Sequence, residues 1–221
     1  MDRLIRNIGV WRGVFKPNRD DFPPSAILPY KARMHRLFVA LRPPPAIREK
    51  LLAIMADIPG ARWQDDDQLH LTLRFIGAVE RPVAEDVAAA LGGVNGAVPT
   101  VRLAGVGAFA HRDRIDTLWA GVAPRDDLAL LHAKVDRACV CAGLPPERRA
   151  YLPHVTLARL PRSLGEGAAI ERWRATHAAL SSEPFAMTHL MLYESDLGRD
   201  GAQYEPVARR PLGTGGDMLG S

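Results

Sequence analysis

Cysteine is scarce in this sequence, which has two cysteines among 221 residues. Cys139 and Cys141 stand two positions apart in a stretch with helical periodicity, so we expect their side chains on different faces of a helix. That arrangement is unsuited to a disulfide bond, and two thiols are too few for a four-ligand zinc site. We therefore expect a protein of the reducing cytoplasm.

Long hydrophobic runs are also absent. No stretch reaches the roughly 18 apolar residues that a membrane-spanning helix needs. The first residues, MDRLIRNIGVWRGVF, contain neither a continuous apolar segment nor a small-residue cleavage site, which argues against a signal peptide. The sequence therefore predicts no association with a membrane.

Lysine is rare as well, with four lysines among 29 basic residues, and the formal net charge is +4. Arginine makes bidentate contacts with phosphate, but a GC-rich coding sequence would produce the same bias and is the simpler explanation. The charge is compatible with a phosphate-bearing partner without indicating one.

The pattern along the sequence indicates one folded domain with two flanking segments. Residues 1–33 include the turn-rich KPNRDDFPPS and show no sustained periodicity, so we expect an N-terminal extension there, with Met34 as an alternative start. Residues 212–221 are typical of a flexible tail. Residues 34–211 are long enough to bury a substantial core.

Within this domain the order strand, helix, strand, helix, strand occurs twice. We expect strands at 36–41, 69–75, 100–110, 117–122, 153–159, 185–194 and 203–210, and helices at 43–58, 83–94, 126–142 and 166–180. Such a duplication predicts an α+β domain of two lobes, built mainly from residues 34–111 and 112–211. Two antiparallel sheets would face a central cleft across a pseudo-two-fold axis, with helices on the outer faces.

Two strings at matching places of the two copies share the phrase His-x-Thr-Leu. They are LHLTLRF at 69–75 and PHVTLAR at 153–159. Because side chains alternate along a strand, His70, Thr72 and Arg74 are expected on the face opposite a row of leucines. We therefore expect Arg74 to contact a bound phosphate.

In the second copy, the same alternation puts His154 and Thr156 on one face. Arg159 falls on the other face, where we expect a surface or interlobe residue unless a bulge resets the register. The duplication would thus deliver two imidazoles and two hydroxyls into one cleft. Threonine is also a common strand residue, so a structural role is the alternative for Thr72 and Thr156.

Paired histidines have a clear use at phosphorus. A neutral imidazole can deprotonate an attacking water or hydroxyl, while a protonated one supplies a proton to the leaving oxygen. Threonine hydroxyls can stabilise the charge that develops on the non-bridging oxygens. This chemistry needs no metal and no cofactor. The residues alone leave open which histidine is the donor.

The motifs and their flanks resemble one family. The strings RLFVAL, LHLTLRFIG, LWAGV, PHVTLARL and LYESDLGRDGAQYEPVARRPL occur in order between residues 34 and 211. Together they are similar to the RNA 2′,3′-cyclic phosphodiesterases, also called 2′-5′ RNA ligases, of the 2H phosphoesterase superfamily. The 33-residue extension is not part of that pattern.

The resemblance implies hydrolysis of RNA 2′,3′-cyclic phosphate ends to 2′-phosphomonoesters, with weak reversible 2′-5′ ligation. It makes His70 the proton donor to the 3′ leaving oxygen and His154 the acceptor of the proton of water, with Thr72 and Thr156 beside them. The partners it implies are RNA ends with a cyclic phosphate, tRNA fragments among them, and we expect a monomer.

Two alternatives stay open. The same histidines could act on a small cyclic phosphate, such as an ADP-ribose derivative, or a basic cleft could hold RNA 3′ ends without turnover. A bell-shaped pH profile would distinguish an enzyme from a binding module, and loss of activity on chelation would indicate a metalloenzyme.

Other features receive structural explanations. Phe38, Phe109 and Trp119 could stack on a base, but core packing is the default for each. The acidic QDDDQ at 64–68 is expected to be a surface turn rather than a cation site. Among the other five histidines, His177 is expected on the apolar stripe of its helix and His132 beside the stripe of another. The remaining three lack a partner motif: His35, His111 and His189.

Overall fold

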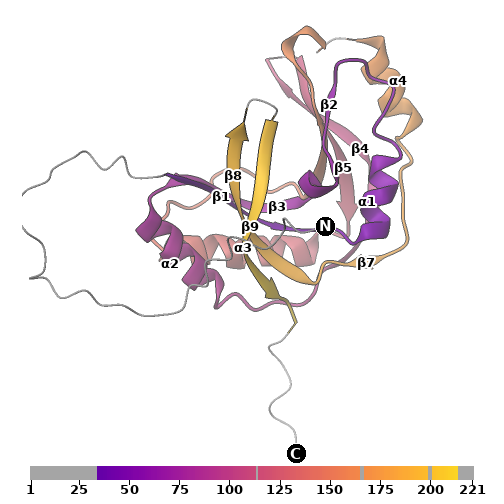
Figure 1. Cartoon of the computed structure of the whole chain (residues 1–221). Coiled ribbons are helices and arrows are strands. Elements are labelled where there is room, and N and C mark those ends of the chain that lie inside the picture. The colour runs from indigo at the N-terminus through magenta and orange to yellow at the C-terminus, as the bar shows by residue number, and fades with distance from the viewer. Residues whose placement is uncertain (1–33, 113, 165–166, 199–200, 214–221) are drawn as a thin grey trace, which may run out of the picture. The chain divides into compact units, whose positions relative to one another are not determined.

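The computed structural model of the chain describes residues 34–112, 114–164, 167–198 and 201–213 (Figure 1). All of them belong to one compact unit. The expected extension at 1–33 and nearly all of the expected tail, 214–221, lie outside the described residues. No helix in the described ranges is both long and apolar enough to span a bilayer.

The secondary structure follows the expected order with shifted ends. The strands are β1 (His35–Leu41), β2 (Arg62–Trp63), β3 (Leu71–Val79), β4 (Thr100–His111), β5 (Arg114–Ala123), β6 (His154–Arg159), β7 (Phe185–Ala186), β8 (His189–Gly198) and β9 (Gly201–Pro211). The helices are α1 (Pro45–Leu52), α2 (Arg81–Leu91), α3 (Asp126–Cys141) and α4 (Ala168–Thr176), with 3₁₀ turns η1 (Asp66–Gln68) and η2 (Arg162–Leu164).

The nine described strands form one antiparallel sheet in the order β7-β4-β5-β6-β3-β1-β8-β9, with β2 on β6. Its middle is narrow, because β3 and β6 pair at a single position, Leu71 with Val155. The sheet is therefore two half-sheets that meet where the two motif strands touch. We call β3, β1, β8 and β9 half-sheet A, and the other five strands half-sheet B. The predicted α+β class with antiparallel sheets is confirmed.

The two halves of the fold differ from the two sequence repeats. β4 belongs to the first repeat but pairs with β5 of the second, and β8 belongs to the second repeat but pairs with β1 of the first. Half-sheet A thus takes β8 and β9 from the second repeat, and half-sheet B takes β4 from the first. The division into lobes at 34–111 and 112–211 does not describe this exchange, which adjacent-strand reasoning cannot foresee.

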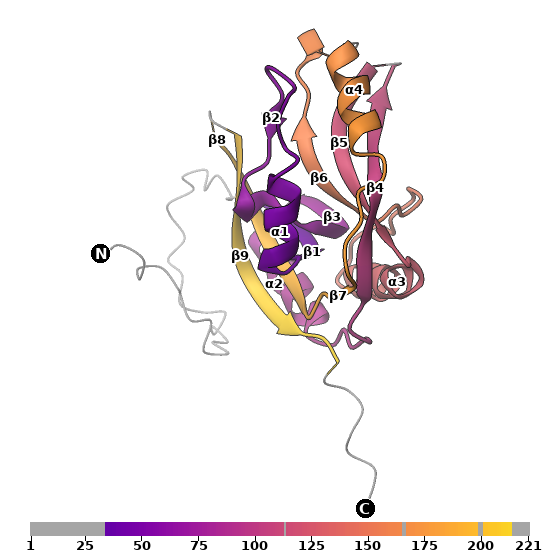
Figure 2. The same ribbon diagram turned by 90° about the vertical axis from the view of Figure 1, so that its right-hand side faces the viewer.

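The helices cover the half-sheets in pairs. Figures 1 and 2 show α2 and α3 against half-sheet A and α1 and α4 against half-sheet B. The indole nitrogen of Trp173 in α4 donates to the Ile54 carbonyl just after α1, at 2.8 Å. This hydrogen bond joins one helix of each repeat.

Helix α3 shows how the sequence pattern produces this packing. Its four-residue stripe is buried as expected: Leu128, Leu131, Val135 and Cys139. Asp126 in its first turn is suited to the positive end of the helix dipole. Cys139 is buried, Cys141 is exposed, and both are free thiols. The expected lack of a disulfide between them is confirmed.

Candidate active site

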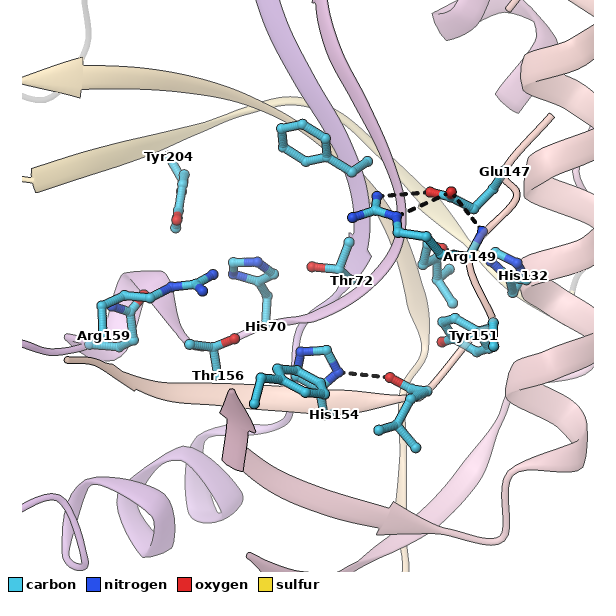
Figure 3. A pocket seen from close by; sticks show the side chains of 16 residues that line it. His70, Thr72, His132, Glu147, Arg149, Tyr151, His154, Thr156, Arg159 and Tyr204 are labelled. Atoms are coloured by element: carbon cyan, nitrogen blue, oxygen red, sulfur yellow. Dashed lines mark hydrogen bonds and ion pairs between the residues drawn. The ribbon is translucent and has the colours of Figure 1, made fainter. Parts of the chain in front are cut away.

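A pocket of about 590 Å³ lies where the half-sheets meet. All four motif side chains that the sequence singled out line it: His70, Thr72, His154 and Thr156 (Figure 3). The other lining residues are Gln64, Leu73, Phe75, Phe109, His132, Glu147, Arg149, Ala150, Tyr151, Leu152, Arg159 and Tyr204. Two motif segments whose histidines are 84 positions apart in the sequence are therefore brought into one cavity.

Each imidazole is held by the backbone two residues before it. His154 Nδ1 lies 2.7 Å from the Leu152 carbonyl oxygen, to which it can donate a hydrogen bond. His70 makes a corresponding backbone hydrogen bond with Gln68. A proton fixed on Nδ1 leaves the lone pair on Nε2, so His154 is prepared to accept a proton there.

Aromatic rings support both imidazoles. The His70 ring lies 4.7 Å from the Phe38 ring and 5.2 Å from that of Tyr204, between centroids. The His154 ring lies 4.8 Å from Phe109 in an edge-on arrangement and 6.0 Å from Trp119. Phe38 is in a small buried cluster separate from the main core. The sequence-based expectation of core packing for these aromatic residues therefore did not include their role in positioning the histidines.

A glycine makes room for one of these rings. Gly107 of β4 is opposite Trp119 of β5, and a Cβ added there would overlap the indole. The ring therefore lies across the neighbouring strand, where any side chain would displace it.

Burial lowers the pKa of both histidines. The pKa of His70 falls to about 4, mainly because the buried ring loses solvation of its charged form, while its Gln68 hydrogen bond opposes the shift. The pKa of His154 also falls, mainly through burial, with the Leu152 carbonyl opposing. The positive charge of Arg159 lowers both pKa values further. Both imidazoles are thus poised to be neutral at pH 7 until an anion binds.

A bulge in each motif strand decides which arginine reaches the pocket. Along β1, Val39 is opposite Arg74 and Ala40 is opposite Thr72, so Leu73 has no partner. Along β5, Leu118 and Trp119 are opposite residues 158 and 156, which leaves residue 157 unpaired. Each bulge inserts one residue into the alternation. The two strands break at the same point of the repeated motif.

The structure does not place Arg74 on the face that strand alternation predicts. The bulge turns Arg74 away from the His/Thr face. The Arg74 side chain is 7% exposed and does not line the pocket. On the same face as the histidines lie Phe75 and Arg159, each five positions after its motif histidine. Arg159, expected outside the site, supplies a cation to it, held by a 2.7 Å hydrogen bond to Thr117.

Arg74 instead connects the first motif strand to helix α3 and to the loop before the second motif. It forms ion pairs with Asp136 of α3 at 2.9 Å and with Glu147 at 3.1 Å, and donates to the Pro145 carbonyl at 2.6 Å. Pro145 and Glu147 belong to the loop that leads to His154. Arg74 itself follows Thr72 in β3, so this buried guanidinium links one motif to the approach of the other.

Several lining residues escaped sequence reasoning. Tyr204 comes from β9, and Gln64 precedes the turn at η1. The position of Tyr204 depends on the strand exchange and that of Gln64 on the pairing of β2 with β6, and no local pattern reports either. A signal also existed for Trp119, which packs beside His154 without lining the pocket. It follows Leu118 as Phe38 follows Leu37, so the duplication pairs the two aromatic residues.

The acidic string before His70 has a structural role. Asp65 caps η1 by accepting from the Gln68 amide at 3.0 Å, and Asp66 binds Arg48 and Arg42 at 2.7 and 2.8 Å. Across the described residues there is no group of three or more His, Cys, Asp or Glu side chains that could hold a metal ion.

The chain is similar to known phosphoesterases. The family model described as LigT-like phosphoesterase matches residues 41–119 and 122–204. A curated relative from Aeropyrum pernix, named RNA 2′,3′-cyclic phosphodiesterase, is 37% identical over 97 residues, covering 43% of this chain and 55% of the relative. A relative of the same name from Geobacillus stearothermophilus is 31% identical over 162 residues, covering 71% and 49%. The chain thus spans about half the length of these two relatives.

Solved structures extend the match across both lobes. A crystal structure of Escherichia coli LigT complexed with 3′-AMP is 26% identical, with a TM-score of 0.64, covering 82% of this chain and 99% of that one. Another structure, of a phosphoesterase, has a TM-score of 0.67 at 26% identity, covering 81% and 99%. By its sequence and its fold, the chain belongs to the LigT-like phosphoesterase family of 2H phosphoesterases.

Proposed function

We propose that this protein hydrolyses RNA 2′,3′-cyclic phosphate ends to 2′-phosphomonoesters by metal-independent acid–base catalysis. The observation that carries the proposal is the matched pair of imidazoles in one pocket, each fixed by the backbone two residues earlier. Relatives named for this reaction support the choice of substrate. In this proposal the protein acts as a cytoplasmic monomer, with tRNA fragments among its substrates.

The proposed reaction is an in-line displacement. His154 takes a proton from water while the water oxygen bonds to phosphorus. The bond between phosphorus and the 3′ oxygen breaks. His70 gives its proton to that 3′ oxygen, and the phosphate stays on the 2′ oxygen. Thr72 and Thr156 donate hydrogen bonds to the non-bridging oxygens, whose charge grows in the transition state. Donor and acceptor are assigned by family resemblance.

Arg159 and the bound phosphate together set the protonation state. His70 has to be protonated to act as a donor, although burial lowers its pKa to about 4 in the free protein. The phosphodiester anion opposes that shift, because a negative charge beside an imidazolium stabilises it. Substrate binding thus creates the acid that the reaction needs.

The decisive experiment uses a short RNA that ends in a 2′,3′-cyclic phosphate, with EDTA present. We expect conversion to the 2′-phosphate, which an alkaline phosphatase removes although it cannot act on the cyclic substrate, and which chromatography would identify. Activity on a cyclic phosphate of ADP-ribose but not on RNA would favour the small-substrate alternative. Tight binding of the RNA without turnover by a folded protein would favour the binding module and overturn the proposal, and loss of turnover with EDTA would overturn metal independence.

The pH profile provides a further prediction. Since the active form needs one protonated and one neutral imidazole, and both pKa values lie below 6.5, kcat/KM is expected to reach its maximum below pH 6.5. It should fall about tenfold per pH unit on the alkaline limb. The kcat profile should lie at higher pH, because the bound anion favours the imidazolium.

An Arg159→Gln variant tests the cause of that profile. Removing the cation should raise both imidazole pKa values and shift the alkaline limb of kcat/KM to higher pH. Initial rates at constant ionic strength between pH 4.5 and 8.5 measure this shift. A wild-type maximum at or above pH 7.5, or an alkaline limb that moves to lower pH in the variant, would contradict the electrostatic account.

A further inference from the structure

The bulge residue of each motif strand is buried and lacks a partner in the strand beside it. Leu73 has none in β1, and β3 pairs with β6 only at Leu71, so neither neighbouring strand pairs with Leu73. Leu157 likewise has none in β5. A buried carbonyl that loses its partner in the sheet needs another donor. Each bulge therefore depends on a group that neither of these neighbouring strands provides.

The two bulges obtain that donor in different ways. The Leu157 carbonyl accepts from the backbone amide of Gln64 at 2.9 Å, a donor that any residue except proline would supply. The Leu73 carbonyl lies 2.7 Å from Nδ1 of His132. Because a carbonyl only accepts, His132 carries a proton on Nδ1. The bulge in β3 is thus held by a side chain where the bulge in β6 is held by the backbone.

Helix α3 contacts the first bulge at two consecutive residues. His132 and Asp136 are one turn apart on one face of α3. His132 binds the Leu73 carbonyl, and Asp136 binds the Arg74 guanidinium at 2.9 Å. The helix is itself anchored by its buried stripe. Together these contacts fix the direction of the Leu73 carbonyl and of the Arg74 side chain, which define the bulge.

His132 also contacts the segment that leads to the second motif. Its ring stacks on that of Tyr151, with centroids 4.2 Å apart and planes 1° apart. Figure 3 shows both rings on the same side of the pocket as Glu147. Tyr151 is three residues before His154 in the sequence. The imidazole of His132 therefore connects the bulge of one motif strand to the approach of the other.

We propose that His132 is a positioning residue of the active site, which holds the bulge in β3 and thereby directs Thr72 toward the phosphate. The inference rests on the proposed function, in which the Thr72 hydroxyl donates to a non-bridging oxygen. Thr72 immediately precedes Leu73, so its direction follows the register that the bulge sets. A slip of one residue would turn its side chain to the opposite face. His132 itself transfers no proton in the reaction.

Two substitutions separate the donor of His132 from its ring. His132→Asn keeps a donor, because its amide nitrogen is as many bonds from Cα as Nδ1 is, and removes the stack on Tyr151. His132→Phe keeps the stack and removes the donor. We expect His132→Phe to lower kcat about tenfold at nearly unchanged KM, since a displaced Thr72 hydroxyl weakens the transition state more than the bound substrate. His132→Asn should restore most of this loss.

A double variant with Thr72 tests the route of the effect. If His132 acts through Thr72, then His132→Phe should cost little further kcat in a Thr72→Val protein, which already lacks the hydroxyl. A loss that persists at full size in that protein would contradict the assignment to Thr72.

Hydrogen exchange of the β3 amides gives a readout that does not depend on turnover. His132→Phe should speed exchange in residues 71–75 relative to both wild type and His132→Asn, because the bulge loses the donor that holds it. The matched control is His177→Phe. His177 packs on Trp173, with ring centroids 5.0 Å apart, and lies outside the pocket, so this variant should change neither kcat nor exchange in β3.

The outcomes separate the positioning role from the reaction. Wild-type kcat and exchange in His132→Phe, or equal losses in the Phe and Asn variants, would overturn the role of His132. A wild type that turns over no cyclic phosphate would overturn the proposed function, and with it the link to Thr72. The exchange rates would in that case still decide whether His132 holds the bulge.

Discussion

Replacing either His70 or His154 by alanine is expected to lower kcat for the RNA cyclic phosphate by about 10²–10⁴-fold. Each imidazole carries one proton transfer in the proposed reaction, and neither has a neighbour in the pocket placed to replace it. His132, the third histidine of the lining, is committed to the Leu73 carbonyl. Single-turnover rates with saturating enzyme would measure the chemical step without product release.

The double variant separates a shared mechanism from two independent contributions. If the imidazoles act in one concerted displacement, His70→Ala with His154→Ala should cost little more than the worse single variant. Losses that multiply would indicate that each residue acts in its own step. His189→Ala, at a partly exposed histidine outside the pocket, controls for the general effect of removing an imidazole.

Folding of these variants is not expected to be the limiting factor. Burial lowers the pKa of both histidines, so the native state gains nothing from charging them, and truncation leaves a space at the edge of an existing pocket. Thermal unfolding should therefore separate loss of activity from loss of structure. A folded His154→Ala protein that keeps more than a third of wild-type kcat would overturn the two-histidine mechanism.

The faces of the two motif strands show which parts of the site could be predicted from the sequence. Alternation correctly places His70 and Thr72 on one face, because both precede the bulge in β3. It fails at Arg74, two residues later, because the extra residue is set by pairing with β1 and has no signature in the string LHLTLRF. The corresponding bulge in β6 brings Arg159 into the pocket. Local pattern is reliable up to the point where a neighbouring strand changes the register.

The fold, too, has features that the sequence predicts and features that it does not. The stripe of α3 and the strand order within each repeat follow from periodicity that a short segment contains. The exchange of β4 and β8 between half-sheets depends on contacts between distant segments. Tyr204 reaches His70 only through that exchange. Pocket-lining residues from the outer strands therefore could not be predicted from the sequence.

Arg74→Ala is expected to have the largest effect on stability. The guanidinium is 7% exposed and is paired with Asp136 and Glu147, which are 21% and 16% exposed. Removing it would leave the partly buried Asp136 without its cation and Glu147 with the exposed Arg149 alone, a type of change that costs about 3–5 kcal/mol. For a protein of this size the midpoint of thermal unfolding should fall by roughly 2–4 °C per kcal/mol.

Arg149→Ala is the matched comparison, because it removes the other arginine of the same Glu147. Arg149 is 76% exposed, and exposed ion pairs contribute about 0–1 kcal/mol. Urea unfolding of both variants at pH 7 should therefore give a large loss for Arg74 and a small one for Arg149. Equal losses would mean that Glu147, rather than the buried cation, holds the network together.

The consequence for catalysis distinguishes a positioning role from a purely structural one. Arg74 holds the Pro145 carbonyl and Glu147, a few residues before the Leu152 carbonyl that orients His154. A folded Arg74→Lys protein, measured well below its unfolding midpoint, should keep the cation but lose the multiple contacts of the guanidinium. We expect its kcat to fall while its KM stays close to wild type, because the base is misplaced and the phosphate contacts remain. An unchanged kcat would confine Arg74 to stability.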